Sequence, residues 1–161
     1  MPPDHVLDPA ECSALARAVA SQIETADLDR SGPGRCELLW RNEHAEAWLN
    51  TWWEPRDTGF HDHGGACVGV HVLEGAASHE QLAVQGPRRI ERHGAGESFA
   101  LGRSGIHRMD HDAGAVTVHV YSPPLRVIGH YELVDGVLHR IEGAADAVSP
   151  PSPGLSAALS R

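Results

Sequence analysis

The chain has 161 residues, a length that fits one domain and allows a sizeable core. Hydrophobic residues make up 41% and charged residues 22%, which is typical of an ordered globular protein. The formal net charge of -9 argues against binding to the phosphate backbone of nucleic acids, and no apolar run approaches the length of a membrane span. Three cysteines without a CxxC pair indicate reduced thiols, and the N-terminus lacks a signal-peptide pattern. We therefore expect a cytoplasmic protein. The sequence gives no clear interface signal, so the oligomeric state stays open between a monomer and a weak dimer.

The N-terminal segment has the pattern of one short helix. Asp8 is a suitable N-cap, Pro9 suits the first helical position, and Glu11 completes a capping box. An apolar stripe then repeats every four residues at Leu15, Val19 and Ile23. We expect this helix to end near Glu24 and to be followed by a loop over residues 27–35.

The rest of the chain consists of short extended segments separated mostly by Gly, Pro, Asn or Asp. The expected strands cover residues 36–40, 45–52, 66–73, 79–84, 88–93, 97–101, 106–111, 115–121, 127–133 and 137–141. Many short strands with no helix-sized segment between them predict an all-β sandwich or barrel rather than a parallel α/β sheet. The predicted organisation is a helix and loop over 1–34, a barrel over 35–142 and a flexible tail over 143–161.

Histidines supply the first indication of function, because the chain contains 12 of them. His61 and His63 lie two apart in an extended pattern, so both imidazoles point to the same side. His107 lies in a similar glycine-rich setting, and we predict that the three side chains hold one divalent metal ion. Iron is the expected ion, although imidazoles also suit zinc, copper and nickel. The other strand histidines are expected on surfaces or at strand ends: His71, His79, His93, His111, His130 and His139.

A second polar pattern lies in the expected strand 115–121. Thr117, His119 and Tyr121 alternate with three valines, so the polar side chains share one face of the strand. Polar groups that face a barrel interior are costly unless they hydrogen-bond to one another or to a ligand. The pattern fits either a catalytic relay or a structural polar network.

Two segments resemble the two motifs of the cupin superfamily: His61-x-His63 with Gly75, and Gly96 with His107. The resemblance implies a cupin-type jelly-roll barrel. Val68 stands where most cupins place a metal-binding glutamate. A site with three histidines and no carboxylate leaves coordination positions open, which suits catalysis better than a structural role.

Three pieces in order resemble the cysteine dioxygenase family: His61-Asp-His63, Gly105-Ile-His-Arg108 and His119-Val-Tyr-Ser-Pro-Pro124. Members of this family are mononuclear non-haem Fe(II) cupins with three histidine ligands. The resemblance implies that His61, His63 and His107 bind Fe(II). It also implies that Tyr121 lies near the substrate and oxygen and that His119 hydrogen-bonds Tyr121. Thr117 replaces the serine at the end of this relay.

The same resemblance implies three substrate-contacting positions. Arg41 matches the arginine that binds the substrate carboxylate, with a salt bridge to Glu43 as the alternative role. Trp53 resembles a tryptophan of the pocket wall, a place for which Trp52 competes. Val68 occupies the position at which animal enzymes carry a cysteine that is cross-linked to the tyrosine.

Two departures from the family pattern concern substrate choice and the cross-link. The tyrosine expected two residues before the substrate arginine is Leu39 here. Cys67 lies one residue before Val68 and is expected on the opposite face of its strand, so we predict no cross-link to Tyr121.

The resemblance therefore implies an Fe(II) thiol dioxygenase that adds both atoms of O2 to the sulfur of a small thiol. L-Cysteine is the expected substrate, and the product is a sulfinate. The alternatives are a cupin metalloenzyme acting on 3-mercaptopropionate or another organic acid, and a non-catalytic cupin that binds a metabolite. No nucleic-acid or membrane partner is expected.

Overall fold

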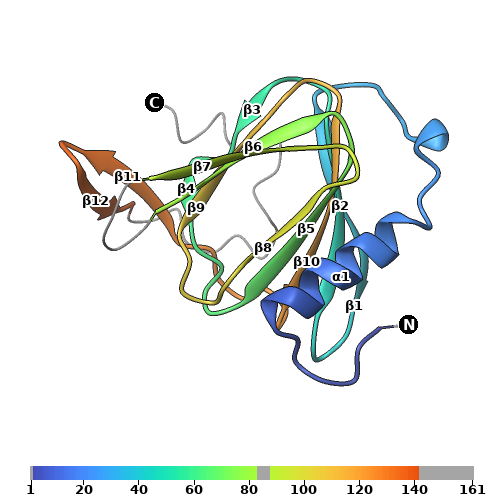
Figure 1. The fold of residues 1–161 in the computed structure, drawn as a ribbon, viewed down its shortest axis with the longest axis horizontal. Helices are drawn as coiled ribbons and strands as arrows, with labels where there is room; N and C mark the ends of the chain where they lie inside the picture. The colour runs from blue at the N-terminus through green and yellow to red at the C-terminus, as the bar shows by residue number, and fades with distance from the viewer. Residues whose placement is uncertain (1, 83–87, 142–161) are drawn as a thin grey trace.

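The computed structural model describes residues 2–82 and 88–141, which form two facing antiparallel sheets with one helix on the outside (Figure 1). The first sheet has the order β1-β2-β10-β5-β8, and the second has the order β12-β11-β4-β9-β6-β7, with β3 paired to β9. The elements are α1 (Pro9–Ala20), the 3-10 turn η1 (Thr25–Asp27), β1 (Gly34–Arg41), β2 (Glu46–Trp52), β3 (Arg56–Asp57), β4 (Phe60–His61), β5 (Cys67–Glu74), β6 (Ala76–Gln81), β7 (Arg89–Gly94), β8 (Ser98–Leu101), β9 (His107–His111), β10 (Ala115–Ser122), β11 (His130–Val134) and β12 (Val137–Arg140).

The predicted helix start is confirmed. The Asp8 side chain accepts a hydrogen bond from the Glu11 backbone N–H at 2.8 Å, and the Glu11 side chain accepts from the Asp8 backbone N–H at 2.8 Å. The helix ends at Ala20, before the predicted Glu24, and a separate 3-10 turn follows. No helix among the described residues is long and apolar enough to cross a membrane.

The predicted all-β barrel with an N-terminal helix is also confirmed, since each expected strand overlaps a strand of the structure. The strand expected from residue 127 begins only at His130. The backbone N–H of Gly129 donates to the Asp62 side chain at 3.1 Å. The residue before His130 is therefore held by a hydrogen bond to a loop side chain and not by strand pairing. Residues 83–84 of one expected strand and the predicted tail over 143–161 lie outside the described residues.

The first sheet separates its side chains into two layers. Val116, Val118 and Val120 pack with α1 on the outer face. Tyr121 belongs to a second cluster, with Val68 and Met109, in the barrel interior. Because side chains alternate along β10, its polar residues Thr117, His119 and Tyr121 face the barrel interior.

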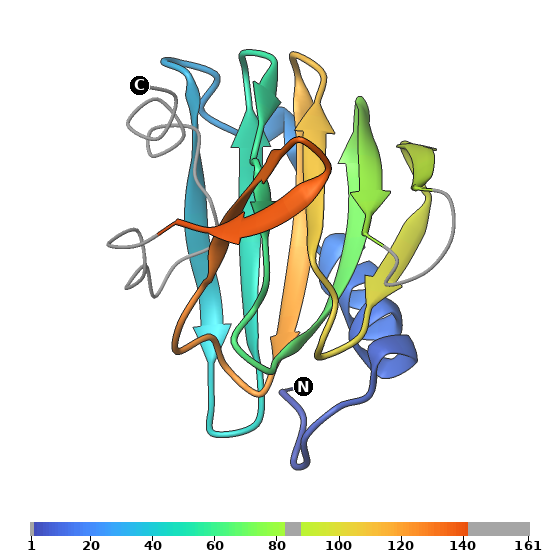
Figure 2. The same ribbon diagram turned by 90° about the vertical axis from the view of Figure 1, so that its left-hand side faces the viewer.

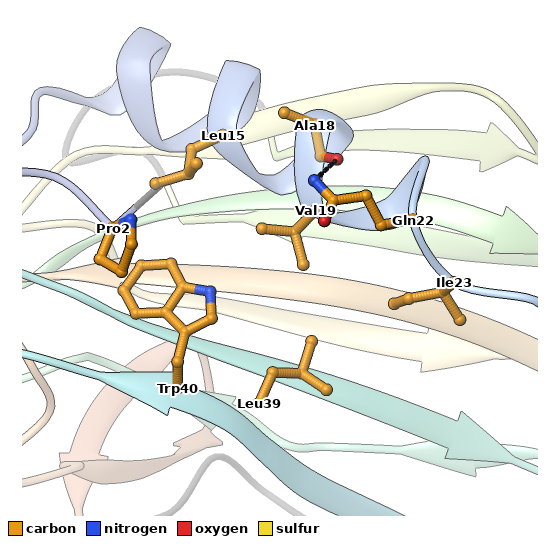
Figure 3. A pocket seen from close by; sticks show the side chains of 8 residues that line it. All are labelled: Pro2, Leu15, Ala18, Val19, Gln22, Ile23, Leu39 and Trp40. Carbon is orange, nitrogen blue, oxygen red and sulfur yellow. Dashed lines mark hydrogen bonds between the residues drawn. The ribbon is translucent and has the colours of Figure 1, made fainter.

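Small residues let α1 lie directly on the sheet. A Cβ atom added to Gly69 would lie 2.2 Å from the backbone of Cys12, so only glycine permits this approach. An apolar hollow opens between α1 and β1 (Figure 3). Its lining consists of Pro2, Leu15, Ala18, Val19, Gln22, Ile23, Leu39 and Trp40. Leu39 thus points to the helix layer and not to the barrel interior.

The hairpin of β11 and β12 projects from the end of the barrel farthest from α1 and crosses in front of the first sheet when the molecule is turned (Figures 1 and 2). Its strands pair from Tyr131 with Arg140 to Val134 with Val137. The Tyr131 hydroxyl donates to the Asp62 carboxylate at 2.5 Å, which ties the hairpin to the residue between His61 and His63.

Candidate metal centre

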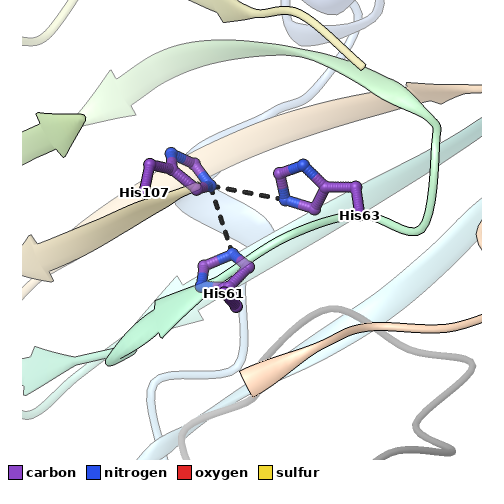
Figure 4. Close-up of side chains that lie close together, drawn as sticks. All are labelled: His61, His63 and His107. Atoms are coloured by element: carbon purple, nitrogen blue, oxygen red, sulfur yellow. Dashed lines mark hydrogen bonds between the residues drawn. The ribbon is translucent and has the colours of Figure 1, made fainter. Parts of the chain in front are cut away.

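Three histidines from two segments converge inside the barrel (Figure 4). His61 belongs to β4 and pairs with His107 of β9 across the second sheet. His63 follows in the loop after β4, and all three side chains are buried. The ladder between β4 and β9 thus brings together residues that are 46 positions apart in the sequence.

The three Nε2 atoms are spaced as ligands of one ion. The Nε2 of His107 lies 3.1 Å from that of His61 and 3.3 Å from that of His63. Two imidazole nitrogens that share a metal ion at about 2.1 Å lie about 3.0 Å apart at a right angle and about 3.4 Å apart at a tetrahedral angle. The donor set and its spacing therefore fit a divalent transition metal.

Protonation also favours metal binding. Burial lowers the pKa of His61 to about 4, and it lowers the pKa values of His63 and His107 well below the usual range. The Nδ1 of His61 lies 3.0 Å from the carbonyl oxygen of Gly59. A carbonyl can only accept, so Nδ1 carries the hydrogen and Nε2 keeps a free lone pair. A neutral, oriented imidazole is the form that a metal requires.

A hydrogen-bonded chain of three side chains lies on β10 beside the histidines. The Tyr121 hydroxyl is 3.1 Å from Nδ1 of His119, and Nε2 of His119 is 3.0 Å from the Thr117 hydroxyl. The Tyr121 ring lies 5.2 Å from the ring of His63, measured between centroids. Burial lowers the pKa of His119 to about 3 and raises that of Tyr121 well above its usual value. At neutral pH this hydrogen-bonded series therefore consists of the neutral imidazole of His119 between the hydroxyl groups of Tyr121 and Thr117.

Arg41 lies at the end of a cross-strand row that includes Tyr121. Arg41 pairs with Glu46, Glu46 pairs with Tyr121, and Tyr121 pairs with Val68 across β1, β2, β10 and β5. The Arg41 Nε donates to Glu46 Oε2 at 2.5 Å. The salt bridge partner considered from the sequence was Glu43. Glu46 is fully buried and its other oxygen accepts from the backbone N–H of Leu125 at 3.2 Å.

The tryptophan expected in the pocket wall needs correction. Trp53 lies outside the barrel, where its indole N–H donates to the carbonyl of Asp29 and its ring lies under Arg30. Trp52 points inward, is 1% exposed and stacks on His111 with ring centroids 3.9 Å apart. Side chains alternate along β2, so the last inward position falls on Trp52 and the next residue faces away.

Val68 and Cys67 occupy opposite faces of β5. Val68 is fully buried in the interior cluster, directly across from Tyr121. Cys67 belongs to the helix layer, and its sulfur lies 3.4 Å from that of Cys12. The prediction that Cys67 points away from Tyr121 agrees with this arrangement.

Two sets of interior residues were not identified from the sequence. Glu46 is the one acidic residue in β2, and its place in a strand with three large apolar side chains was the available signal. His79 and His111 were expected on surfaces or strand ends but are 5% and 1% exposed. Both lie at inward positions, on β6 and β9, which only the sheet pairing reveals.

Comparison with known proteins identifies the family. The family model described as cysteine dioxygenase type I matches residues 10–133, which is most of the chain. The chain belongs to this family. A search of curated proteins finds no match.

Solved structures agree on the fold. The BH2720 protein of Bacillus halodurans is 14% identical with a TM-score of 0.54, and the match covers 88% of this chain and 89% of that one. A variant of the oxalate decarboxylase of Bacillus subtilis is 15% identical with a TM-score of 0.51, over 63% of this chain and 29% of that one. The Cnp3 cupin domain of Schizosaccharomyces pombe is 11% identical with a TM-score of 0.51, over 62% of this chain and 71% of that one. At these identities the likeness shows the cupin fold alone.

Proposed function

We propose that this protein is a mononuclear non-haem Fe(II) thiol dioxygenase that converts a small thiol, L-cysteine, to its sulfinate in the cytoplasm. The convergence of three neutral imidazoles beside a buried tyrosine carries the proposal. Membership of the cysteine dioxygenase type I family supports dioxygenase chemistry in general. In the reaction both oxygen atoms of O2 form bonds to sulfur, and the sulfur supplies all the electrons that O2 takes up. No further reductant is required.

His61, His63 and His107 are the residues that would hold the iron. A ferrous ion bound there supplies open positions for the thiolate and for O2, and it favours loss of the thiol proton. The burial of all three ligands keeps bulk water away from the reacting groups.

Tyr121 acts as an oriented hydrogen-bond donor in this proposal. If the Thr117 hydroxyl donates to Nε2 of His119, Nδ1 carries the hydrogen and donates to the Tyr121 oxygen. The tyrosine hydrogen is then free to point at the substrate or at oxygen. The raised pKa of Tyr121 keeps this hydrogen in place at neutral pH.

Arg41 is the proposed partner of the substrate carboxylate. Its Nε is occupied by Glu46, which fixes the guanidinium and leaves the Nη groups as donors. The side chain is 42% exposed, so it can meet a substrate that enters from solvent. Val68 borders the same row and limits the space beside Tyr121.

The test is oxygen uptake by protein that has been loaded anaerobically with Fe(II). L-Cysteine, 3-mercaptopropionate and cysteamine are compared, because only the first two carry a carboxylate. Uptake with L-cysteine and a matching sulfinate product support the proposal. Preference for 3-mercaptopropionate selects that alternative substrate, whereas no uptake at full iron occupancy refutes thiol oxygenation.

The Arg41→Ala variant tests the carboxylate contact in the same assay. Loss of a charge-assisted hydrogen bond at a partly exposed site raises KM by about tenfold. We expect this rise for thiols with a carboxylate and no change for any turnover of cysteamine. Arg35→Ala is the matched control, since Arg35 lies on the same strand and pairs with Asp29 at the surface.

A further inference from the structure

A second group of potential metal ligands lies on the hairpin of β6 and β7. His79 and Glu91 face each other across the two strands, and His93 is two residues after Glu91. The three side chains therefore lie on the same face of the hairpin. Each offers a ligand atom, and these atoms lie within 4.8 Å of one another.

Both imidazoles of this group have a buried nitrogen without a hydrogen-bond partner among the described residues. The atoms are Nε2 of His79 and Nε2 of His93, and the His79 residue is 5% exposed. A buried polar atom is normally paired, so two unpaired nitrogens that flank one carboxylate indicate a missing partner.

Phe99 packs against both imidazoles of the group, and a hollow lies in front of His79 and Glu91. Both imidazole rings stack on Phe99 with centroid distances of 4.4 Å. A hollow of about 240 Å³ is bordered by His79, Glu91 and Phe99, with Gln81, Arg89 and Ala100 completing its lining. The space is sufficient for an ion with bound water.

The carboxylate is oriented by an arginine. Glu91 Oε1 accepts from the Arg89 guanidinium at 2.8 and 2.7 Å. Its Oε2 lies 3.8 Å from Nε2 of His93, which is too long for a hydrogen bond. A ligating carboxylate is commonly held by such an outer hydrogen bond, so Arg89 leaves Oε2 available to an ion.

We propose that His79, Glu91 and His93 form a second divalent-metal site, separate from the three-histidine centre. Two imidazoles and one carboxylate are a ligand set for zinc and related transition-metal ions. An ion bound there would tie β7 to β6. The site lies beside the first centre, because the His79 ring lies edge-on to His107 with centroids 4.9 Å apart.

The experiment counts metal ions in protein that has first been made metal-free. Equilibrium dialysis against Zn²⁺ is followed by elemental analysis, at a pH near 7. We expect two tightly bound ions per wild-type chain and one in the His61→Ala/His63→Ala variant. The Glu91→Gln/His93→Ala variant also retains one, and the variant with all four changes retains none. Circular dichroism and a melting curve check that each variant is folded.

The matched control changes the same residue types on another hairpin. Glu132 and His139 face each other across β11 and β12 and are both exposed. Glu132→Gln/His139→Ala keeps two ions if the assignment is right. Loss of an ion from this control, or a single ion in the wild-type chain, overturns the assignment.

A single substitution covers the case in which the double variant does not fold. Glu91→Gln preserves the shape of the side chain and removes the charge. In the His61→Ala/His63→Ala background, we expect it to weaken Co²⁺ binding by about tenfold or more, as followed by visible absorption. Unchanged Co²⁺ affinity would overturn the proposal. None of these measurements depends on dioxygenase activity, so their outcome is separate from that of the proposed function.

Discussion

Replacement of Thr117 by valine tests whether the polar chain on β10 acts as a relay. Thr117 is fully buried, and its hydroxyl lies 3.0 Å from Nε2 of His119. Valine keeps the branched shape and leaves this nitrogen without its partner. A buried unpaired polar atom costs about 1–3 kcal/mol of unfolding free energy. The hydrogen bond from Thr117 sets the direction of donation through His119 to Tyr121. Loss of about 1.4 kcal/mol at this hydrogen bond corresponds to about a tenfold fall in kcat.

The assay combines urea unfolding with oxygen uptake on the thiol that the enzyme accepts. We expect kcat to fall by about tenfold, with KM and iron content unchanged, because Thr117 does not reach the substrate. Thr51→Val is the matched control, since the Thr51 hydroxyl accepts from the Arg35 backbone N–H at 3.0 Å on the outer face of the neighbouring strand. This control should lose stability and keep its kcat.

A double-mutant cycle separates the relay from a purely structural network. If Thr117 acts through the hydroxyl of Tyr121, then Thr117→Val should have no further effect on kcat in a Tyr121→Phe background. Equal losses of kcat in both backgrounds would refute this reasoning. So would a Thr117→Val enzyme with wild-type kcat and reduced stability.

Three further predictions concern packing, pH and the absent cross-link. Gly69→Ala should lower the free energy of unfolding in urea by about 1–3 kcal/mol, because its Cβ would meet the helix backbone. Gly102→Ala, where the Cβ would meet open space, should be nearly neutral. Equal stabilities of the two variants would contradict this packing explanation. Burial lowers the pKa of His111 from 6.5 to about 3, so below pH 6.5 the unfolded chain binds a proton that the folded chain does not. Stability should therefore fall as pH decreases towards 3, and the slope for metal-free His111→Phe should be shallower by about 1.4 kcal/mol per pH unit. Peptide mass spectrometry of the active enzyme should find Cys67 and Tyr121 on separate, unlinked peptides.

The parts of the site that follow from local periodicity could be predicted from the sequence. The inward face of β10 required only its alternation with valine. The spacing of two residues singled out His61 and His63, although β4 ends at His61 and His63 lies in the loop that follows. The partner of Arg41 could not be predicted in this way. Glu46 and Glu43 are both near in sequence, and the register of β1 with β2 selects Glu46. Cross-strand register depends on the whole sheet, which a single segment does not encode.

The same reason explains the histidines that were assigned to surfaces. His79 lies in a strand whose polar composition, Ser78 to Gln81, is typical of an exposed ladder. In the structure β6 pairs on both sides, with β7 and β9, and Ala77, His79 and Glu80 of this strand are buried. The exposure of a polar strand is therefore decided by its neighbours. For this reason the sequence alone did not predict that His79 lies close to Glu91 and His93.

The interior position across from Tyr121 shows how one residue of offset changes the chemistry available to a site. Adjacent residues on a strand face opposite ways, so Cys67 contacts Cys12 under the helix while Val68 contacts the interior. A sulfur at position 68 could meet the tyrosine, but a sulfur at position 67 cannot do so without reversing the strand. A reversal would bury the wrong set of side chains on both faces of β5. The hydroxyl of Tyr121 is held by its hydrogen bond to His119. In the proposed function, this hydrogen bond does the positioning that a covalent link would otherwise perform.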